Sequence, residues 1–106
     1  MEGVHSRPVH CDAGAVVIET TLEEGAEVPR HVHNSNQVTV VLEGSIVLGV
    51  EGLGEKILSA GEYMYIPPGK AHWAKSPYGV ARVLDINWPT TPERAELYRE
   101  IGGECL

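Results

Sequence analysis

The chain is poor in basic residues, and its charge is strongly one-sided. Eight of the 106 residues are Lys or Arg and fifteen are Asp or Glu, which gives a formal net charge of −7. No run of Lys or Arg occurs anywhere in the sequence. Nucleic acids and anionic membranes both attract clustered positive charge, so we expect neither as a partner.

The sequence also lacks a long apolar run. The most apolar stretch, residues 38–50, is interrupted by Glu43, Gly44 and Ser45 and falls far short of the roughly 20 apolar residues that a membrane-spanning helix needs. The first residues contain no apolar segment typical of a secretory signal. We therefore expect a cytoplasmic protein.

Cysteine is scarce, with Cys11 and Cys105 near opposite ends of the chain. Two cysteines are too few for a fold held together by disulfides. In a cytoplasmic protein both are expected to be reduced thiols. A bridge that ties the two ends together is the alternative.

Glycine and proline are plentiful and divide the chain into short segments rich in β-branched residues. The sequence has twelve Gly and seven Pro, and their distribution along the chain is typical of strands joined by turns. A helix is expected only between Thr91 and Gly102, with Pro92 in its first turn. Seven or eight strands and one terminal helix predict an all-β fold, a small barrel or sandwich, in a single domain over residues 1–106. The expected strands lie within residues 14–22, 37–43, 45–50, 52–62, 62–66, 70–73 and 80–88.

Three histidines lie close to turn residues and are candidates for a metal site. His31 and His33 are two residues apart, which places both side chains on one face of an extended strand. Gln37 shares that face if the strand is continuous, although residues 34–36 could break the register. His72, which follows a Pro-Gly turn, is the obvious third imidazole. Imidazoles on one face suit a borderline metal ion, but a His-x-His pair alone could equally be structural.

The glycines around these histidines make the pattern more specific. Residues 25–44 read G-x5-H-x-H-x3-Q-x6-G, and residues 61–76 read G-x5-P-x-G-x2-H-x3-S. In order and spacing they resemble the two signature motifs of the cupin superfamily. The resemblance implies a small cupin-type β-barrel, also called a double-stranded β-helix or jelly roll, with a short C-terminal helix.

The same resemblance implies that His31, His33, Gln37 and His72 hold one divalent metal ion per chain at one end of the barrel. These ligand types do not distinguish Zn, Mn, Fe, Ni and Cu. Two positions depart from the family pattern, which usually has Glu in place of Gln37 and Asn in place of Ser76. A cupin that keeps the histidines without binding metal is the alternative.

Gln37 bears on the chemistry of such a site. Three neutral imidazoles and a neutral amide leave the charge of a divalent ion, about +2, without compensation from the protein. The site should therefore favour an anionic ligand such as a carboxylate or enolate oxygen. The ligand set also differs from the His-plus-carboxylate sites of non-haem iron. It favours Lewis-acid chemistry over dioxygenase chemistry.

A narrower resemblance is to the pectin-degradation cupins, which open the ring of unsaturated uronates. Residues 31–37 share their H-x-H-x3-Q spacing, and the segment VLDINWPTTPER, residues 83–94, is similar to their strand end and proline-rich turn. The resemblance implies that Asp85 faces the cavity and exchanges a proton with the substrate. Asp85 could instead cap the turn before Pro89.

The match to those enzymes weakens beyond Asp85. Asn87 stands where they have an aromatic residue, and Thr91 stands where they have an arginine. Arg94 takes the place of that arginine, which holds the substrate carboxylate, only if the turn is longer here. Other basic candidates for that role are Lys70, Lys75 and Arg82.

These observations lead to a metal-dependent enzyme of the lyase or isomerase type, acting on a small anionic carbohydrate or sugar acid, with Asp85 and Arg94 as catalytic residues. A quercetinase-like dioxygenase and a non-catalytic ligand-binding cupin are the alternatives. A homodimer is expected because Val38, Val40 and Leu42 alternate with a second apolar set, and a strand that is apolar on both faces needs a cover on both.

Overall fold

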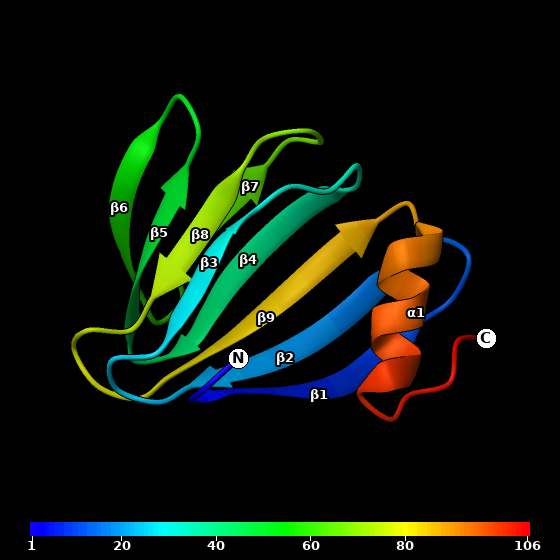
Figure 1. Ribbon diagram of the computed structural model, residues 1–106, viewed down its shortest axis with the longest axis horizontal. Helices are drawn as coiled ribbons and strands as arrows, with labels where there is room; N and C mark the ends of the chain where they lie inside the picture. Colours follow the sequence, from blue (N-terminus) through cyan, green and yellow to red (C-terminus); the bar gives the residue numbers. More distant parts are fainter.

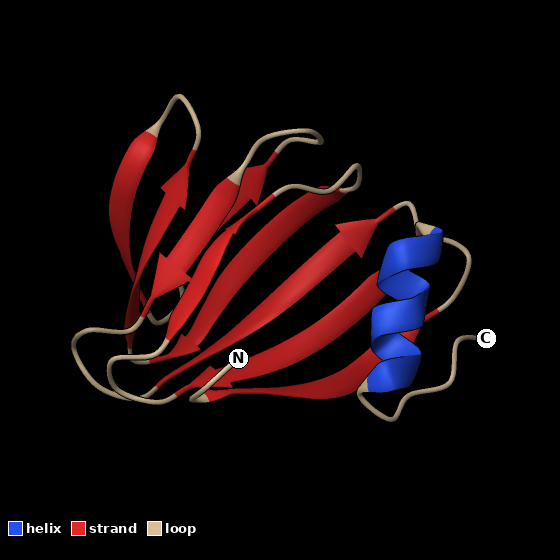
Figure 2. Ribbon diagram, viewed as in Figure 1, coloured by secondary structure: helices blue, strands red, loops and turns tan.

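The computed structural model describes residues 1–106 and shows nine strands and one helix, which confirms the all-β fold class (Figures 1 and 2). The helix α1 spans Pro92–Glu100 and is neither long nor apolar enough to cross a membrane. The strands are β1 (Val4–Cys11), β2 (Val16–Leu22), β3 (Glu27–His31), β4 (Asn36–Glu43), β5 (Ser45–Val50), β6 (Gly54–Ser59), β7 (Tyr63–Ile66), β8 (His72–Lys75) and β9 (Ala81–Trp88).

The strands form two antiparallel sheets that pack face to face. One has the order β1-β2-β9-β4-β7 and the other the order β3-β8-β5-β6. Figure 1 shows the two sheets diverging toward one end, with α1 beside β1 and β2. Residues from both sheets, among them Leu22, Val41, Ile46 and Leu58, make one buried apolar cluster between them. This cluster closes one end of the space between the sheets and leaves the other end for polar groups.

The turn between β4 and β5 explains the last glycine of the first motif. Gly44 has φ +73°, in the left-handed region that residues with a Cβ rarely adopt. A Cβ at this position would lie 2.5 Å from the carbonyl oxygen of Val80. Glycine is therefore required here both by the backbone conformation and by the close approach of a neighbouring segment.

Two strands were not anticipated from the sequence, and both contain a proline. Pro8 lies in β1 and Pro29 lies in β3, each at the edge of its sheet. Proline cannot donate to a neighbouring strand, so edge strands are where it is tolerated. β1 also carries a register shift between Pro8 and His10, which interrupts the alternation that marks a strand.

The expectation of two reduced thiols is wrong. Cys11 and Cys105 form a disulfide, with a Cα–Cα distance of 4.6 Å and 94 residues between them in sequence. The chain folds so that the tail after α1 returns to the end of β1, where the backbone N–H of Leu106 donates to the carbonyl of Cys11 at 2.8 Å. Pairing depends on this tertiary proximity, which cysteine count and spacing do not report.

The outer face of the five-stranded sheet is apolar over β4 and β7, whereas Glu19 and Arg82 form an ion pair on the same face over β2 and β9. Val38, Val40 and Leu42 are only half-buried, because β4 directs Gln37 and Val41 to the interior instead. Tyr63 and Tyr65 on β7 are 68% and 45% exposed. A homodimer across this face stays a prediction.

Candidate functional site

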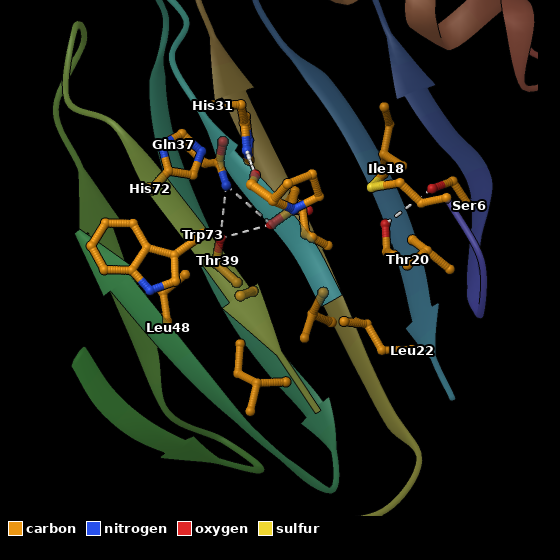
Figure 3. Close-up of a pocket in the computed structure, with 18 of the residues that line it drawn as sticks. Ser6, Ile18, Thr20, Leu22, His31, Gln37, Thr39, Leu48, His72 and Trp73 are labelled. Atoms are coloured by element: carbon orange, nitrogen blue, oxygen red, sulfur yellow. Dashed lines mark hydrogen bonds between the residues drawn. The ribbon is translucent and has the colours of Figure 1, made fainter. Parts of the chain in front are cut away.

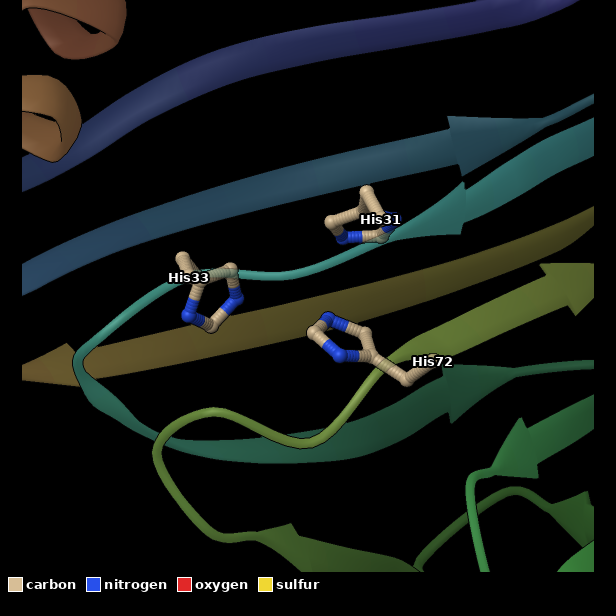
Figure 4. A group of neighbouring side chains, drawn as sticks. All are labelled: His31, His33 and His72. Atoms are coloured by element: carbon tan, nitrogen blue, oxygen red, sulfur yellow. The ribbon is translucent and has the colours of Figure 1, made fainter.

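Three imidazoles come together at the open end between the sheets (Figure 4). His31 ends β3 and is paired in register with His72, the first residue of β8. His33 lies in the loop after β3, so the strand does not continue to Gln37. The ring centroids of His31 and His72 are 4.1 Å apart, and those of His33 and His72 are 4.8 Å apart. One ring nitrogen from each of the three lies within 4.8 Å of the others.

The orientation of two of these rings is fixed by backbone carbonyls. Nδ1 of His31 donates to the carbonyl of Pro29 at 2.9 Å, and Nδ1 of His72 donates to the carbonyl of Lys70 at 3.0 Å. Because a carbonyl only accepts, both Nδ1 atoms carry the proton and both Nε2 atoms present a lone pair. Nε2 of His72 is buried and has no hydrogen-bond partner. A buried lone pair of this kind is what a metal ion would satisfy.

Gln37 supplies an oxygen beside the histidines. Its Oε1 lies 2.7 Å from Nε2 of His33 and also accepts from Nδ2 of Asn87 at 3.1 Å. Its amide nitrogen donates to Oγ1 of Thr39 at 2.9 Å and to Oδ1 of Asp85 at 3.3 Å. These two acceptors hold the amide so that its oxygen, rather than its nitrogen, faces the imidazoles.

The donor set fits a divalent metal ion of the borderline class. Three imidazoles and an amide oxygen are ligands that such ions accept. The hydrogen bonds that orient His31, His72 and Gln37 are of the kind that hold metal ligands in place. The structure thus brings together all four residues expected from the sequence.

Burial favours the neutral form of two of the imidazoles, those of His33 and His72. Burial lowers the pKa of His72 to about 4, and burial together with the positive charge of Arg94 lowers the pKa of His33. Neutral imidazole is the form that binds a metal. At neutral pH His33 and His72 can therefore bind an ion without first losing a proton.

The same shifts predict how the stability of the metal-free protein depends on pH. Between pH 6.5 and about 4 the unfolded chain binds protons at His72 and His33 that the folded chain does not, so stability is full above pH 6.5 and is lost as pH falls through this window. The raised pKa of Asp85 acts in the opposite direction. We expect thermal unfolding with chelator to show a Tm lower by at least ~5 °C at pH 5 than at pH 7.5.

Substituting one of these histidines tests the origin of this dependence. His72→Gln removes the titrating group and should flatten the dependence, whereas His5→Gln, a change at an exposed residue, should leave it as in the unsubstituted protein. An equal slope in all three proteins would show that the buried imidazoles do not cause it.

Asp85 lies in the middle of β9, opposite Thr39 of β4, so it does not cap a turn. The Thr39 hydroxyl donates to its Oδ1 at 2.7 Å. Burial raises the pKa of Asp85, while the hydrogen bond from Thr39 and the charge of Arg94 oppose that rise. A carboxyl group with a raised pKa beside a cavity is suited to taking up and releasing a proton.

Arg94 reaches the same place from the first turn of α1. The Thr91 hydroxyl caps this helix by accepting from the backbone N–H of Arg94 at 3.3 Å. The guanidinium donates through Nη2 to Oδ1 of Asn87 at 2.8 Å, while its Nε is buried without a partner. Burial lowers the pKa of Arg94, and the charge of Asp85 raises it. A buried guanidinium with an unused donor is suited to an anion.

These groups line a cavity of about 300 Å³ between the sheets (Figure 3). His31, Gln37, His72, Asp85 and Arg94 all contribute to its wall. The polar side chains gather at the histidine end, and eleven of the twenty lining residues are hydrophobic. The arrangement can bind oxygen atoms at one end and exchange a proton there.

The other basic candidates lie away from this cavity. Arg82 pairs with Glu19 and Glu43, Lys75 lies 3.8 Å from Glu55, and Lys70 is exposed. Of the four basic candidates, only Arg94 lines the cavity, and its role as the family's arginine stays a prediction.

Two further residues of the site have a role that motif matching did not assign. Thr39 links Gln37 to Asp85, and Asn87 links Gln37 to Arg94. The signal available in the sequence was alternation, since residues 37 and 39, like 85 and 87, fall on one face of a strand.

Comparison with solved structures finds the same fold in proteins of several kinds. An RmlC-like cupin from Shewanella frigidimarina is 26% identical, with a TM-score of 0.81 over 88% of this chain and 82% of the other. KdgF from Halomonas sp. is 21% identical, with a TM-score of 0.81 over 88% and 86%. The polyketide cyclase RemF from Streptomyces resistomycificus is 24% identical, with a TM-score of 0.75 over 86% and 68%. No curated protein gives a significant match.

A family comparison agrees with the fold and with the spacing of the two motifs. Residues 18–87, which include both motifs and all four expected metal ligands, match the cupin domain. This match extends over more than half of the chain. The chain therefore belongs to the cupin family.

Proposed function

We propose that this cupin is a metal-dependent enzyme that transfers a proton on a small anionic substrate. The observation that carries the proposal is the convergence, on one cavity, of two imidazoles of the three-histidine cluster, a buried carboxyl group and a buried guanidinium. Each group meets a different requirement of such a reaction. The histidines would bind substrate oxygens through a metal ion, the carboxyl group would exchange a proton, and the guanidinium would hold an anion.

His31, His33, His72 and Gln37 would hold the metal ion, which when bound supplies Lewis-acid polarisation of substrate oxygens. The protein adds no negative charge among these four side chains. Anionic oxygens from the substrate are therefore favoured at this end of the cavity.

Asp85 acts as the proton-transfer group. It lies at the cavity wall between Thr39 and the Gln37 amide, and both hold its Oδ1. The other carboxyl oxygen has no hydrogen bond to a side chain of the protein, which leaves it for the substrate. Its raised pKa moves the carboxyl group toward the range in which it takes up and gives back a proton near neutrality.

Arg94 holds the anionic group of the substrate. Asn87 fixes the guanidinium through one nitrogen, and the remaining donors, including the unpartnered Nε, stay available to a carboxylate. Asp85 and Arg94 approach the cavity from β9 and α1, so an anion between them can be oriented relative to the proton-transfer group.

Ring opening of an unsaturated uronate is one reaction of this class. It is supported by the sequence resemblance around Asp85 and by the similar fold of KdgF from Halomonas sp. The fold of RemF, a polyketide cyclase, is also similar. A dioxygenase on the same ligands and a non-catalytic binding protein are the competing functions. Carbohydrate metabolism is part of this proposal for the case of ring opening, and a homodimer is part of it in every case. A cytoplasmic location also remains part of it, in which case the disulfide between Cys11 and Cys105 is an exception to the usual reduced state of cytoplasmic thiols.

An assay with unsaturated uronate tests the proposed roles. If ring opening of the uronate is the reaction, metal-loaded protein will remove the ultraviolet absorbance of the substrate. With any substrate that is turned over, we expect Asp85→Asn to lower kcat by about 10²–10⁴-fold and Arg94→Gln to raise KM more than it lowers kcat. Metal content should be unchanged in Asp85→Asn, because Asp85 is not a ligand.

Two parallel measurements separate the alternatives. Oxygen consumption with enediol or flavonol substrates would favour the dioxygenase, and a ligand-induced thermal shift without any product would favour the binding protein. Full activity of Asp85→Asn would remove the assigned proton-transfer role.

A further inference from the structure

The inner face of the five-stranded sheet changes from polar to apolar along the barrel. The register pairs Gln37 with Asn87 at the histidine end, and Asp85 with both Thr39 and Ile18 in the next row. The rows beyond pair Thr20 with Val83 and Leu22 with Ala81. Side chains two residues apart share a face, so the series runs from amides through one carboxyl group to hydrocarbon.

The inner face of the four-stranded sheet shows the same change in the same direction. His72 is paired with His31 on one side and Val50 on the other. One row further from the histidines, Ala74 lies between Val28 and Leu48. Val28, Ala74 and Leu48 line the cavity, as does Ile46 beyond them. Below the histidine end the wall formed by the four-stranded sheet is therefore hydrocarbon, and the wall formed by the five-stranded sheet is hydrocarbon apart from Ser6 and Thr20.

Hydroxyl groups in the apolar part are few and already paired. Ser6 of β1 and Thr20 of β2 line the cavity, and their oxygens lie 3.3 Å apart, hydrogen-bonded to each other. No charged side chain accompanies them in this part of the wall. A ligand that entered it with several hydroxyl groups would exchange their bonds to water for contacts with methyl groups, which is unfavourable.

We propose that the substrate carries its anionic oxygens at one end and an otherwise apolar body, and that the rows containing Val28, Ala74 and Ile18 select for that body. The anionic end rests on the proposed function, because His31, His72 and Arg94 hold it. The apolar end rests only on the shape and composition of the cavity.

The volume of the cavity limits the size of the apolar part of the substrate. A cavity of about 150 Å³ holds a benzene molecule, and this one has about 300 Å³, so it takes a body of about two fused rings. The selected class is an aromatic or alicyclic acid with an oxygen next to its carboxylate.

Isothermal titration calorimetry with two matched anions tests this inference. 3-Hydroxy-2-naphthoate and D-galacturonate both carry a carboxylate with a nearby hydroxyl group but differ in the rest of the molecule. We expect naphthoate to bind at least about tenfold more tightly, with a more negative heat-capacity change, because it buries apolar surface. Equal affinity, or tighter binding of galacturonate, would overturn the inference.

Two variants locate the selectivity. Ala74→Leu fills part of the cavity and should weaken naphthoate binding by at least about tenfold; Val28→Thr keeps the side-chain volume and should weaken it about threefold by adding a hydroxyl group. Neither touches a metal ligand, so zinc stoichiometry should not change. Ala13→Leu and Val9→Thr, which make the same exchanges at exposed residues, are the controls. If Ala74→Leu does not fold, the affinity of Val28→Thr for naphthoate alone tests whether these rows select the apolar part of the substrate.

Repeating both titrations on zinc-loaded and zinc-free protein separates the two proposals. Failure of the protein to bind zinc and each of Mn, Fe, Ni and Cu would overturn the metal-dependent function, while a preference for naphthoate that Val28→Thr reduces would still support the apolar substrate. Normal zinc binding without that preference would overturn only the substrate class.

Discussion

Replacement of Cys11 and Cys105 by serine is expected to destabilise the folded protein by about 2–4 kcal/mol. The bridge closes a loop across a sequence separation of 94 residues. Without it the unfolded chain has a higher conformational entropy, which stabilises the unfolded state relative to the folded one. For a domain of this size the change corresponds to a Tm lower by at least ~10 °C, measured by calorimetry of the double variant.

Removal of the disulfide should also affect Arg94, which lies at the opposite end of α1 from Cys105. Ala95 and Tyr98 of that helix pack with Cys11 in one buried cluster, so weakening this attachment loosens the element that carries the guanidinium. Faster hydrogen exchange in α1 than in β4 would report it. The unsubstituted protein with reducing agent should behave like the double variant; a Tm unchanged by both treatments would contradict the prediction.

Loss of two histidines is expected to abolish metal binding. Protein purified without chelator should contain near one metal ion per chain, and the double variant His31→Ala/His72→Ala should retain none. Changes to residues that only support metal ligands already weaken binding about 10–100-fold, and here two ligands are removed. Elemental analysis of the purified proteins measures the result.

Reconstitution provides the control for this experiment. Saturating metal at about 100 times its Kd should stabilise the unsubstituted protein by about 2.7 kcal/mol, whereas the double variant should gain nothing. His5→Ala/His10→Ala, at two exposed histidines, should bind metal normally. Metal retained by His31→Ala/His72→Ala would place the site elsewhere.

The candidate metal ligands could be predicted because their spacing is a local property. His31, His33 and Gln37 lie within one short segment, and His72 follows a turn whose proline and glycine fix its direction. The break in β3 before His33 did not matter, because a loop can present an imidazole as well as a strand can. Whether Arg94 reaches the cavity depends instead on the length of the turn before α1, and this length is seen only in the structure.

The elements that sequence reasoning missed depend on contacts between distant segments. The strands containing Pro8 and Pro29 are stabilised by one neighbouring strand each, so their own composition does not mark them. The pairing of Cys11 with Cys105 requires the return of the tail to β1. The apolar rows of the cavity require the register of β8 with β3 and β5, which brings Val28 and Leu48 to either side of Ala74.

The disulfide between Cys11 and Cys105 makes the chain from β2 to the end of α1 a closed covalent ring. The exposed turn at residues 51–53 lies inside this ring, between the hydrogen-bonded strands β5 and β6. One backbone cut there therefore opens the ring without dividing the molecule, and the two segments remain joined through sulfur. A second cut within the ring would release the piece between the two cuts, and reduction of the disulfide would separate the segments that carry Cys11 and Cys105.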